Sequence, residues 1–119
     1  MPEKSHYDDL IAKELATGRA ALKAGNDGMV RVCARRASGQ AITWFVTIRK
    51  LSWPPDAMAQ LRMLAEDSGF PQAARDAATR LTTKITDRFT YPFSTDPLGD
   101  AQIIIDAING LIPREGPSI

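Results

Sequence analysis

An apolar stripe with helical spacing between Val30 and Ile48 constrains the fold of this chain more than any other feature. The spacing continues for about five turns, and Ile42 and Val46 widen it, so it predicts one long amphipathic helix over residues 28–50, capped by Asp27. The members of the stripe are Val30, Cys33, Ala34, Ala37, Ala41, Trp44, Phe45 and Ile48.

The two halves of this predicted helix differ in side-chain size. The first half carries Ala34, Ala37, Gly39 and Ala41, and the second half carries the bulky residues of the stripe. A glycine inside a helix costs about 1 kcal/mol relative to alanine. We therefore expect a neighbouring helix to cross closely at Gly39.

Two further helices are predicted in the first half of the chain. Ser5 is a suitable N-cap for a helix over residues 6–24, which the pair Gly25-Asn26 ends. The prolines after Trp53 interrupt the long helix, and an apolar pattern around Leu61 predicts a short helix that ends near Gly69.

The second half of the chain predicts two more helices. One begins after Phe70-Pro71, continues to Phe89 and carries a charged face that includes Arg75, Arg80, Lys84 and Arg88. We interpret that face as solvated. Residues 90–95 are expected to form a loop. Asp96 then caps a final helix that begins at Pro97 and is stopped by Pro113.

The chain is therefore expected to be all-α, an up-and-down bundle of about five helices in a single domain over residues 1–119. Its core spans about 6–112, and 113–119 form a frayed tail. The 44% hydrophobic and 24% charged composition is typical of a globular protein, and the net charge of +1 restricts any nucleic-acid contact to a local patch. The sequence shows no signal peptide and no apolar run of about 20 residues, so we expect a cytoplasmic protein that does not enter a membrane.

Metal and cofactor chemistry has little support in the residues. Cys33 is the only cysteine and His6 the only histidine, too few for a zinc site. Cys33 also lies on the apolar stripe, which favours a buried, inert thiol over a nucleophile. We expect no metal and no cofactor.

The order of these features resembles that of the HEPN domains (higher eukaryotes and prokaryotes nucleotide-binding). The similarity covers residues 6–112. It rests on the Gly25-Asn26 turn, the long alanine-rich helix with Arg31–Gly39, the short helix with Leu61 and Leu64, and the helix from Phe70-Pro71 to Phe89. The resemblance implies a helical bundle, often a homodimer and often paired with a nucleotidyltransferase-like partner.

Many HEPN proteins are ribonucleases or toxins that use an arginine followed four to six residues later by a histidine. Arg88 stands at the corresponding place, but residues 89–95 contain no histidine, and His6 lies in another element. We therefore predict no catalytic residue. The leading hypothesis is a non-catalytic HEPN-like domain that acts by association. The alternatives are an RNA-cleaving or RNA-binding protein, and a structural adaptor that binds a protein helix beside the long helix.

The candidate nucleotide- or RNA-binding residues are Arg31, Arg35, Arg36, Arg88 and Tyr91. Guanidinium groups match phosphate oxygens, and Arg31 and Arg35 share one face of a helix. The alternative is that these arginines pair with Asp or Glu from neighbouring helices.

The candidate interface residues are three aromatics in loops beside prolines: Trp53, Tyr91 and Phe93. They would form a dimer patch or stack on a base. Alternatively, they cap the ends of the bundle.

Overall fold

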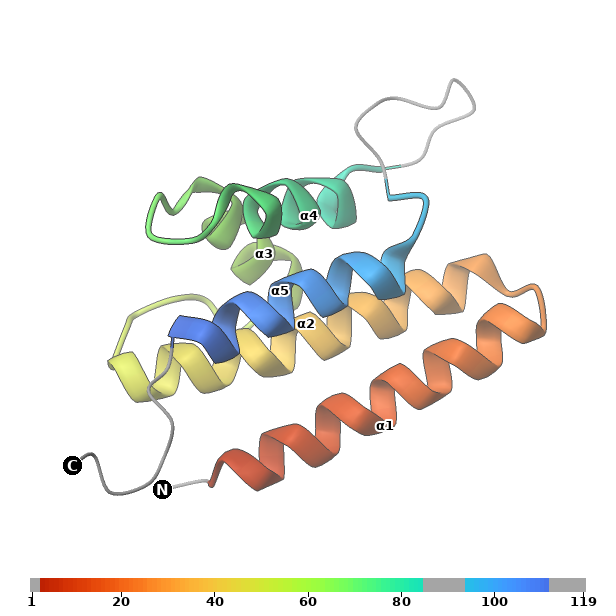
Figure 1. The fold of residues 1–119 in the computed structure, drawn as a ribbon, viewed down its shortest axis with the longest axis horizontal. Helices are drawn as coiled ribbons and strands as arrows, with labels where there is room; N and C mark the ends of the chain where they lie inside the picture. Colours follow the sequence, from red (N-terminus) through yellow and green to blue (C-terminus); the bar gives the residue numbers. More distant parts are fainter. Residues whose placement is uncertain (1–2, 85–93, 112–119) are drawn as a thin grey trace.

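The computed structural model describes residues 3–84 and 94–111, and in these ranges it contains five helices and no strand. It confirms the predicted all-α bundle (Figure 1). No helix in the described ranges is long and apolar enough to cross a membrane. The helices are α1 (Lys4–Lys23), α2 (Asp27–Arg49), α3 (Ala57–Glu66), α4 (Gln72–Thr82) and α5 (Pro97–Leu111).

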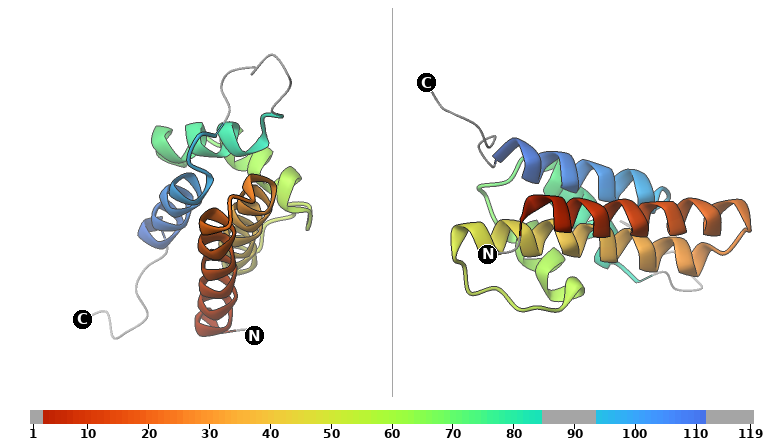
Figure 2. Two further views of the ribbon diagram at one scale, coloured as in Figure 1. Left: turned by 90° about the vertical axis from the view of Figure 1, so that its right-hand side faces the viewer. Right: turned by 90° about the horizontal axis from the view of Figure 1, so that it is seen from below.

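The long helix α2 lies at the centre of the bundle. α1 packs on one side of it, α5 runs along it, and α3 and α4 form the opposite side (Figures 1 and 2). Arg31 and Arg49, near the two ends of α2, contact Ser94 before α5 and Leu111 at its end. α2 and α5 therefore run in the same direction, whereas strict up-and-down alternation of five helices would make the second and the fifth antiparallel.

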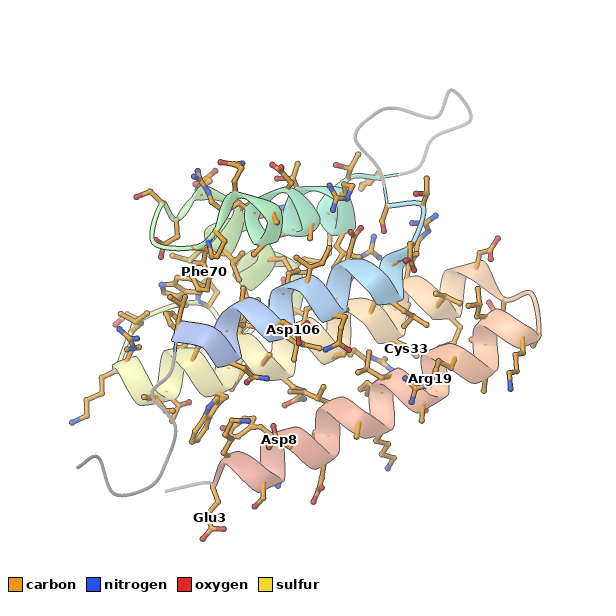
Figure 3. All side chains as sticks on the ribbon, in the orientation of Figure 1. Glu3, Asp8, Arg19, Cys33, Phe70 and Asp106 are labelled. Carbon is orange, nitrogen blue, oxygen red and sulfur yellow. The ribbon has the colours of Figure 1, made fainter. Side chains whose placement is uncertain are left out.

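The core lies between α2, α3, α4 and α5. Phe45 packs against Phe70, with ring centroids 5.1 Å apart, at the end of the bundle where α2 finishes (Figure 3). Trp53 covers these two rings, at 6.1 Å from Phe45 and 6.5 Å from Phe70. The largest fully buried apolar side chains are Ile42, Leu61, Leu64, Leu81, Ile104 and Ile108.

Gly39 lies at a close crossing of α2 and α3, which confirms the prediction made for it. A Cβ added at Gly39 would stand 3.0 Å from the Cβ of Ala57. Gly18 plays a similar part on α1, since a Cβ there would stand 3.1 Å from the Cβ of Cys33 and 2.7 Å from Leu98.

The predicted ends of the first two helices need correction. α1 begins at Lys4, so Ser5 lies inside the first turn and is not the N-cap; Lys4 forms an ion pair with Asp8 there instead. Asn26, rather than Asp27, caps α2, because its side-chain Oδ1 accepts from the backbone N–H of Met29 at 3.1 Å. Gly25 adopts a φ of 74°, the left-handed conformation expected of a helix-ending glycine.

The start of α5 follows the prediction. The Asp96 Oδ1 accepts from the backbone N–H of Gly99 at 3.1 Å, and Pro97 is the first helical residue. Ile112 and Pro113 lie outside the described residues, as do the rest of the frayed tail predicted for 113–119 and most of the loop predicted for 90–95.

The fourth helix is shorter than predicted. α4 ends at Thr82, and Thr83 is extended, whereas the apolar pattern predicted a helix to Phe89; residues 85–93 lie outside the described ranges. The hydroxyls of Thr79, Thr82 and Thr83 all donate to carbonyls one turn back. Such back-bonding by β-branched residues weakens a helix, and apolar spacing does not register it.

Candidate functional site

Two arginines on the first half of α2 reach the ends of the chain segment that joins α4 to α5. The Nη1 of Arg31 donates to the carbonyl of Ser94 at 2.8 Å. The Nε of Arg35 donates to the carbonyl of Leu81, in the last turn of α4, also at 2.8 Å. Both side chains are half-buried. We call Arg31 and Arg35 the α2 arginine pair.

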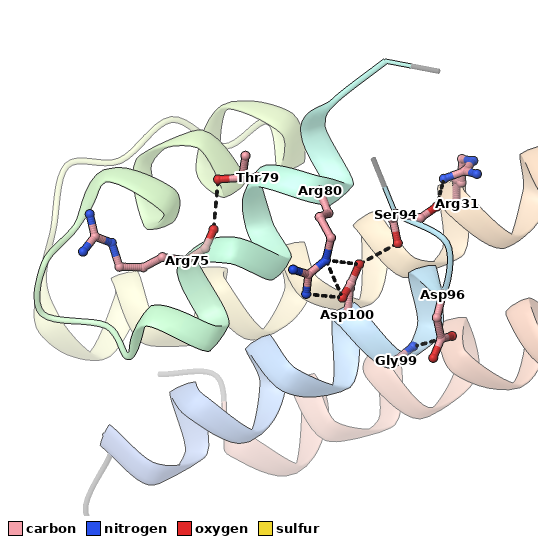
Figure 4. A network of polar contacts seen from close by, with 8 residues as sticks. All are labelled: Arg31, Arg75, Thr79, Arg80, Ser94, Asp96, Gly99 and Asp100. Atoms are coloured by element: carbon pink, nitrogen blue, oxygen red, sulfur yellow. Dashed lines mark hydrogen bonds and ion pairs between the residues drawn. The ribbon is translucent and has the colours of Figure 1, made fainter. Parts of the chain in front are cut away.

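An ion pair between the half-buried Arg80 and the buried Asp100 lies next to this pair and joins α4 to α5. Arg80 donates through Nη2 to Oδ1 of Asp100 at 2.7 Å and through Nε to both carboxylate oxygens at 3.2 Å (Figure 4). The Ser94 hydroxyl donates to Oδ2 of Asp100 at 2.6 Å. We call Arg80, Asp100 and Ser94 the Asp100 network.

Ser94 connects the Asp100 network to the α2 arginine pair. Its hydroxyl contacts Asp100 and its carbonyl contacts Arg31, and the residue is fully buried (Figure 4). Polar contacts therefore run without interruption from α4 through α5 and Ser94 to α2.

The positive charge of the α2 arginine pair has no carboxylate partner in the part of the chain that the structure describes. Among the described residues, Asp100 forms an ion pair with Arg80 only, and no carboxylate pairs with Arg31 or Arg35. Burial lowers the pKa of Arg35, and the neighbouring charge of Arg31 lowers it further. The hydrogen bond to Asp100 raises the pKa of Arg80 instead. The α2 arginine pair therefore holds partly desolvated positive charge.

The three arginines predicted on the long helix have different surroundings in the structure. Arg31 and Arg35 share a face as expected, but the partners that they have among the described residues are backbone carbonyls rather than the Asp or Glu side chains considered from sequence. Arg36 is exposed and lies near Cys33, where its charge opposes the rise in the thiol pKa caused by burial.

Of the other predicted site residues, only Trp53 lies within the residues that the structure describes. Arg88, Tyr91 and Phe93 lie outside the described residues. Trp53 is half-buried against Phe45 and Phe70, which agrees with the alternative that it caps the end of the bundle.

Sequence reasoning overlooked Asp100 and Ser94 and treated Arg80 as part of a solvated face. A signal for Asp100 was present: it stands four residues before Ile104 and eight before Ile108, on the buried face of α5. A carboxylate on an apolar face indicates a buried partner. Ser94 carries no comparable signal in the sequence.

His6 lies far from the arginines. Its ring meets that of Tyr7 edge-on, and Tyr7 packs on Trp44, with centroids 5.4 Å apart in each case. Trp44 is thirteen residues beyond Arg31, or about 20 Å along α2. Within the described ranges, no group of His, Cys, Asp or Glu side chains is arranged to hold a metal ion.

Comparisons of the chain with protein-family models, curated proteins and solved structures find no match. The site is therefore interpreted from its own residues and geometry.

Proposed function

We propose that this chain is a non-catalytic, HEPN-like helical domain that acts by association. We infer that it binds the phosphate groups of a nucleotide or RNA at the α2 arginine pair. The observation that carries the proposal is the pairing of two half-buried guanidinium groups, one turn apart, with backbone carbonyls alone among the described residues.

Among the residues that the structure describes, the geometry leaves hydrogen-bond donors for a ligand. Each guanidinium has five N–H donors, and the bonds to Ser94 and Leu81 use one donor of each arginine. A partly desolvated cation attracts an anion more strongly than a fully hydrated one does. Planar guanidinium donors also match the oxygens of a phosphate.

The proposal includes no catalytic histidine, because His6 lies too far from the α2 arginine pair. A general acid or base must come within hydrogen-bond reach of the group it serves. His6 lies beside Tyr7, which packs on Trp44, about 20 Å along α2 from Arg31. It is therefore outside the reach of a phosphate bound at the arginine pair.

The test is binding of a fluorescein-labelled oligouridylate, measured by anisotropy over a range of salt concentrations. We expect Arg31→Gln and Arg35→Gln each to weaken binding by about fivefold to tenfold and to reduce the salt slope by about 0.7, because each removes one phosphate contact. Competition by a mononucleotide distinguishes a nucleotide site from an RNA site.

Arg75→Gln is the matched control. Arg75 also donates from Nε to a backbone carbonyl, that of Ala65 at 3.0 Å, but its side chain points away from the network (Figure 4). We expect the affinity and salt slope of this variant to match those of the wild type. Equal losses in all three variants, or none, would contradict the proposal.

Self-association belongs to the same proposal, because the HEPN resemblance implies a homodimer and a nucleotidyltransferase-like partner. Leu22 and Met29 supply exposed apolar surface on either side of the α1–α2 turn, with 56% and 39% of their areas accessible. Light scattering after size exclusion should give a dimer mass that Leu22→Glu lowers. A wild-type monomer at all concentrations would remove this part of the proposal.

A further inference from the structure

We propose that Ser94 and Asp100 are positioning residues for Arg31, so that phosphate binding depends on a buried network that does not touch the ligand. This inference rests on the proposed function of the α2 arginine pair. It goes further by assigning different supports to the two arginines.

Asp100 is the residue whose position is most restricted in the network. Its side chain is 7% exposed and accepts three contacts from Arg80 and one from Ser94. Charge-assisted and bidentate bonds of this kind hold their partners in one geometry. The hydroxyl of Ser94 is thereby held at 2.6 Å from a carboxylate that cannot shift without breaking an ion pair.

Ser94 in turn restricts the position of Arg31. The same buried residue accepts the Nη1 of Arg31 on its carbonyl at 2.8 Å. A guanidinium is planar, so fixing one of its nitrogens restricts the directions of the others. The donors of Arg31 that remain for a phosphate are therefore oriented before the ligand arrives, which lowers the entropy cost of binding.

Arg35 has a separate support. Its Nε donates to the carbonyl of Leu81, which is fixed by α4 itself rather than by Ser94. Loss of the Ser94 hydroxyl should therefore release Arg31 and leave Arg35 in place. A general loss of stability would show no such asymmetry.

The experiment is a double-mutant cycle with the fluorescein-labelled oligouridylate as the probe. We expect Ser94→Ala to weaken binding by about threefold to fivefold in the wild type and in Arg35→Gln, but to have little effect in Arg31→Gln. Equal effects of Ser94→Ala in the Arg31→Gln and Arg35→Gln backgrounds would overturn the inference, as would no effect in the wild type.

Ser38→Ala is the matched control for folding. Ser38 is also fully buried, but its hydroxyl donates to the carbonyl of Ala34 within α2 and has no contact with the Asp100 network. We expect this variant to keep wild-type affinity. A loss equal to that of Ser94→Ala would show that the effect arises from core stability, and would overturn the inference.

A second readout needs no ligand. In the free protein, ¹⁵N relaxation of the arginine side chains should show increased mobility of the Arg31 guanidinium in Ser94→Ala and unchanged Arg35. Unchanged Arg31 relaxation would refute the positioning role. Altered relaxation together with unaffected binding in Arg31→Gln and Arg35→Gln would refute the proposed function instead, so the two failures are distinguishable.

Discussion

Burial of the Cys33 side chain makes the free energy of unfolding depend on pH. The side chain is 0% exposed and faces Gly18 of α1 (Figure 3). Burial raises the pKa of its thiol from the ordinary value of 9.0, and Glu14 adds to the rise. The unfolded chain therefore releases this proton at a lower pH than the folded chain does.

This shift predicts a loss of stability at alkaline pH. Between the unfolded pKa of 9.0 and the higher folded pKa, the folded state binds more protons than the unfolded state. The free energy of unfolding then falls by up to about 1.4 kcal/mol per pH unit as pH rises, and the contribution is constant below that window. Urea unfolding at a series of pH values measures it.

Cys33→Ala supplies the reference for this measurement, because lysines and tyrosines also titrate at alkaline pH. The variant should be less stable at neutral pH, since it loses a buried group. Its free energy of unfolding should fall less steeply than that of the wild type above pH 9.0. Parallel curves for the two proteins would show that the thiol does not contribute.

At the scale of helices, three C-terminal ends are completed by arginines from other elements. Arg75 donates to Ala65 of α3, Arg35 to Leu81 of α4 and Arg49 to Leu111 of α5. The last carbonyls of a helix lack partners within it and carry partial negative charge. These arginines therefore stabilise helix ends that have no glycine cap, and they fix the helices relative to one another.

The crossing of α2 and α3 gives a prediction at the same scale. Gly39→Ala should gain helix propensity but place a Cβ 3.0 Å from that of Ala57, which lies on backbone that has to move. Because overpacking of this kind outweighs the propensity gain, we expect a net loss of about 1 kcal/mol. Chemical denaturation measures the change.

Gly28→Ala is the control for Gly39→Ala on the same helix. The nearest atom to a Cβ there is Oδ1 of Asn26 at 3.8 Å, an ordinary contact distance. This variant should be as stable as the wild type or more stable by about 0.5 kcal/mol. A stabilised Gly39→Ala protein would mean that α3 shifts without cost and that the crossing does not require glycine.

Across the whole molecule, α1 is the helix least tied to the rest. It packs almost entirely on α2 and makes little contact with α5 (Figure 2). Its buried residues are only Tyr7, Gly18 and Ala21, and the rest of the helix is half-buried or exposed. Local opening requires least free energy where the fewest apolar contacts break.

Hydrogen exchange tests this difference in stability. We expect the amides of α1 to exchange faster than those in the middle of α2 and α5. Mass spectrometry of peptides from protein labelled in its native state measures the exchange. Tyr7→Ala should accelerate exchange in α1 further, because it removes the contact with Trp44, and should leave α5 unchanged. Equal protection of α1 and α2 would show that the bundle opens only as a unit.

The sequence by itself determined the features that depend on neighbouring residues. Helical spacing located α2, and the Gly25-Asn26 and Asp96-Pro97 pairs marked a helix end and a helix start, because periodicity, capping and proline geometry act within a few residues. The same local rules chose Ser5 and Asp27 wrongly. α1 begins before Ser5, after a Glu3 whose side chain makes no cap hydrogen bond, and Asn26 caps α2 in place of its neighbour Asp27.

Only the tertiary structure decided the partners of the charged residues. Arg31 and Ser94 are 63 residues apart and Arg35 and Leu81 are 46 apart, and spacing along the chain does not encode such contacts. The pairing of Arg80 with Asp100 likewise became visible only when α4 and α5 were placed together. The physical reason is that buried polar groups must find partners wherever the packed helices bring them.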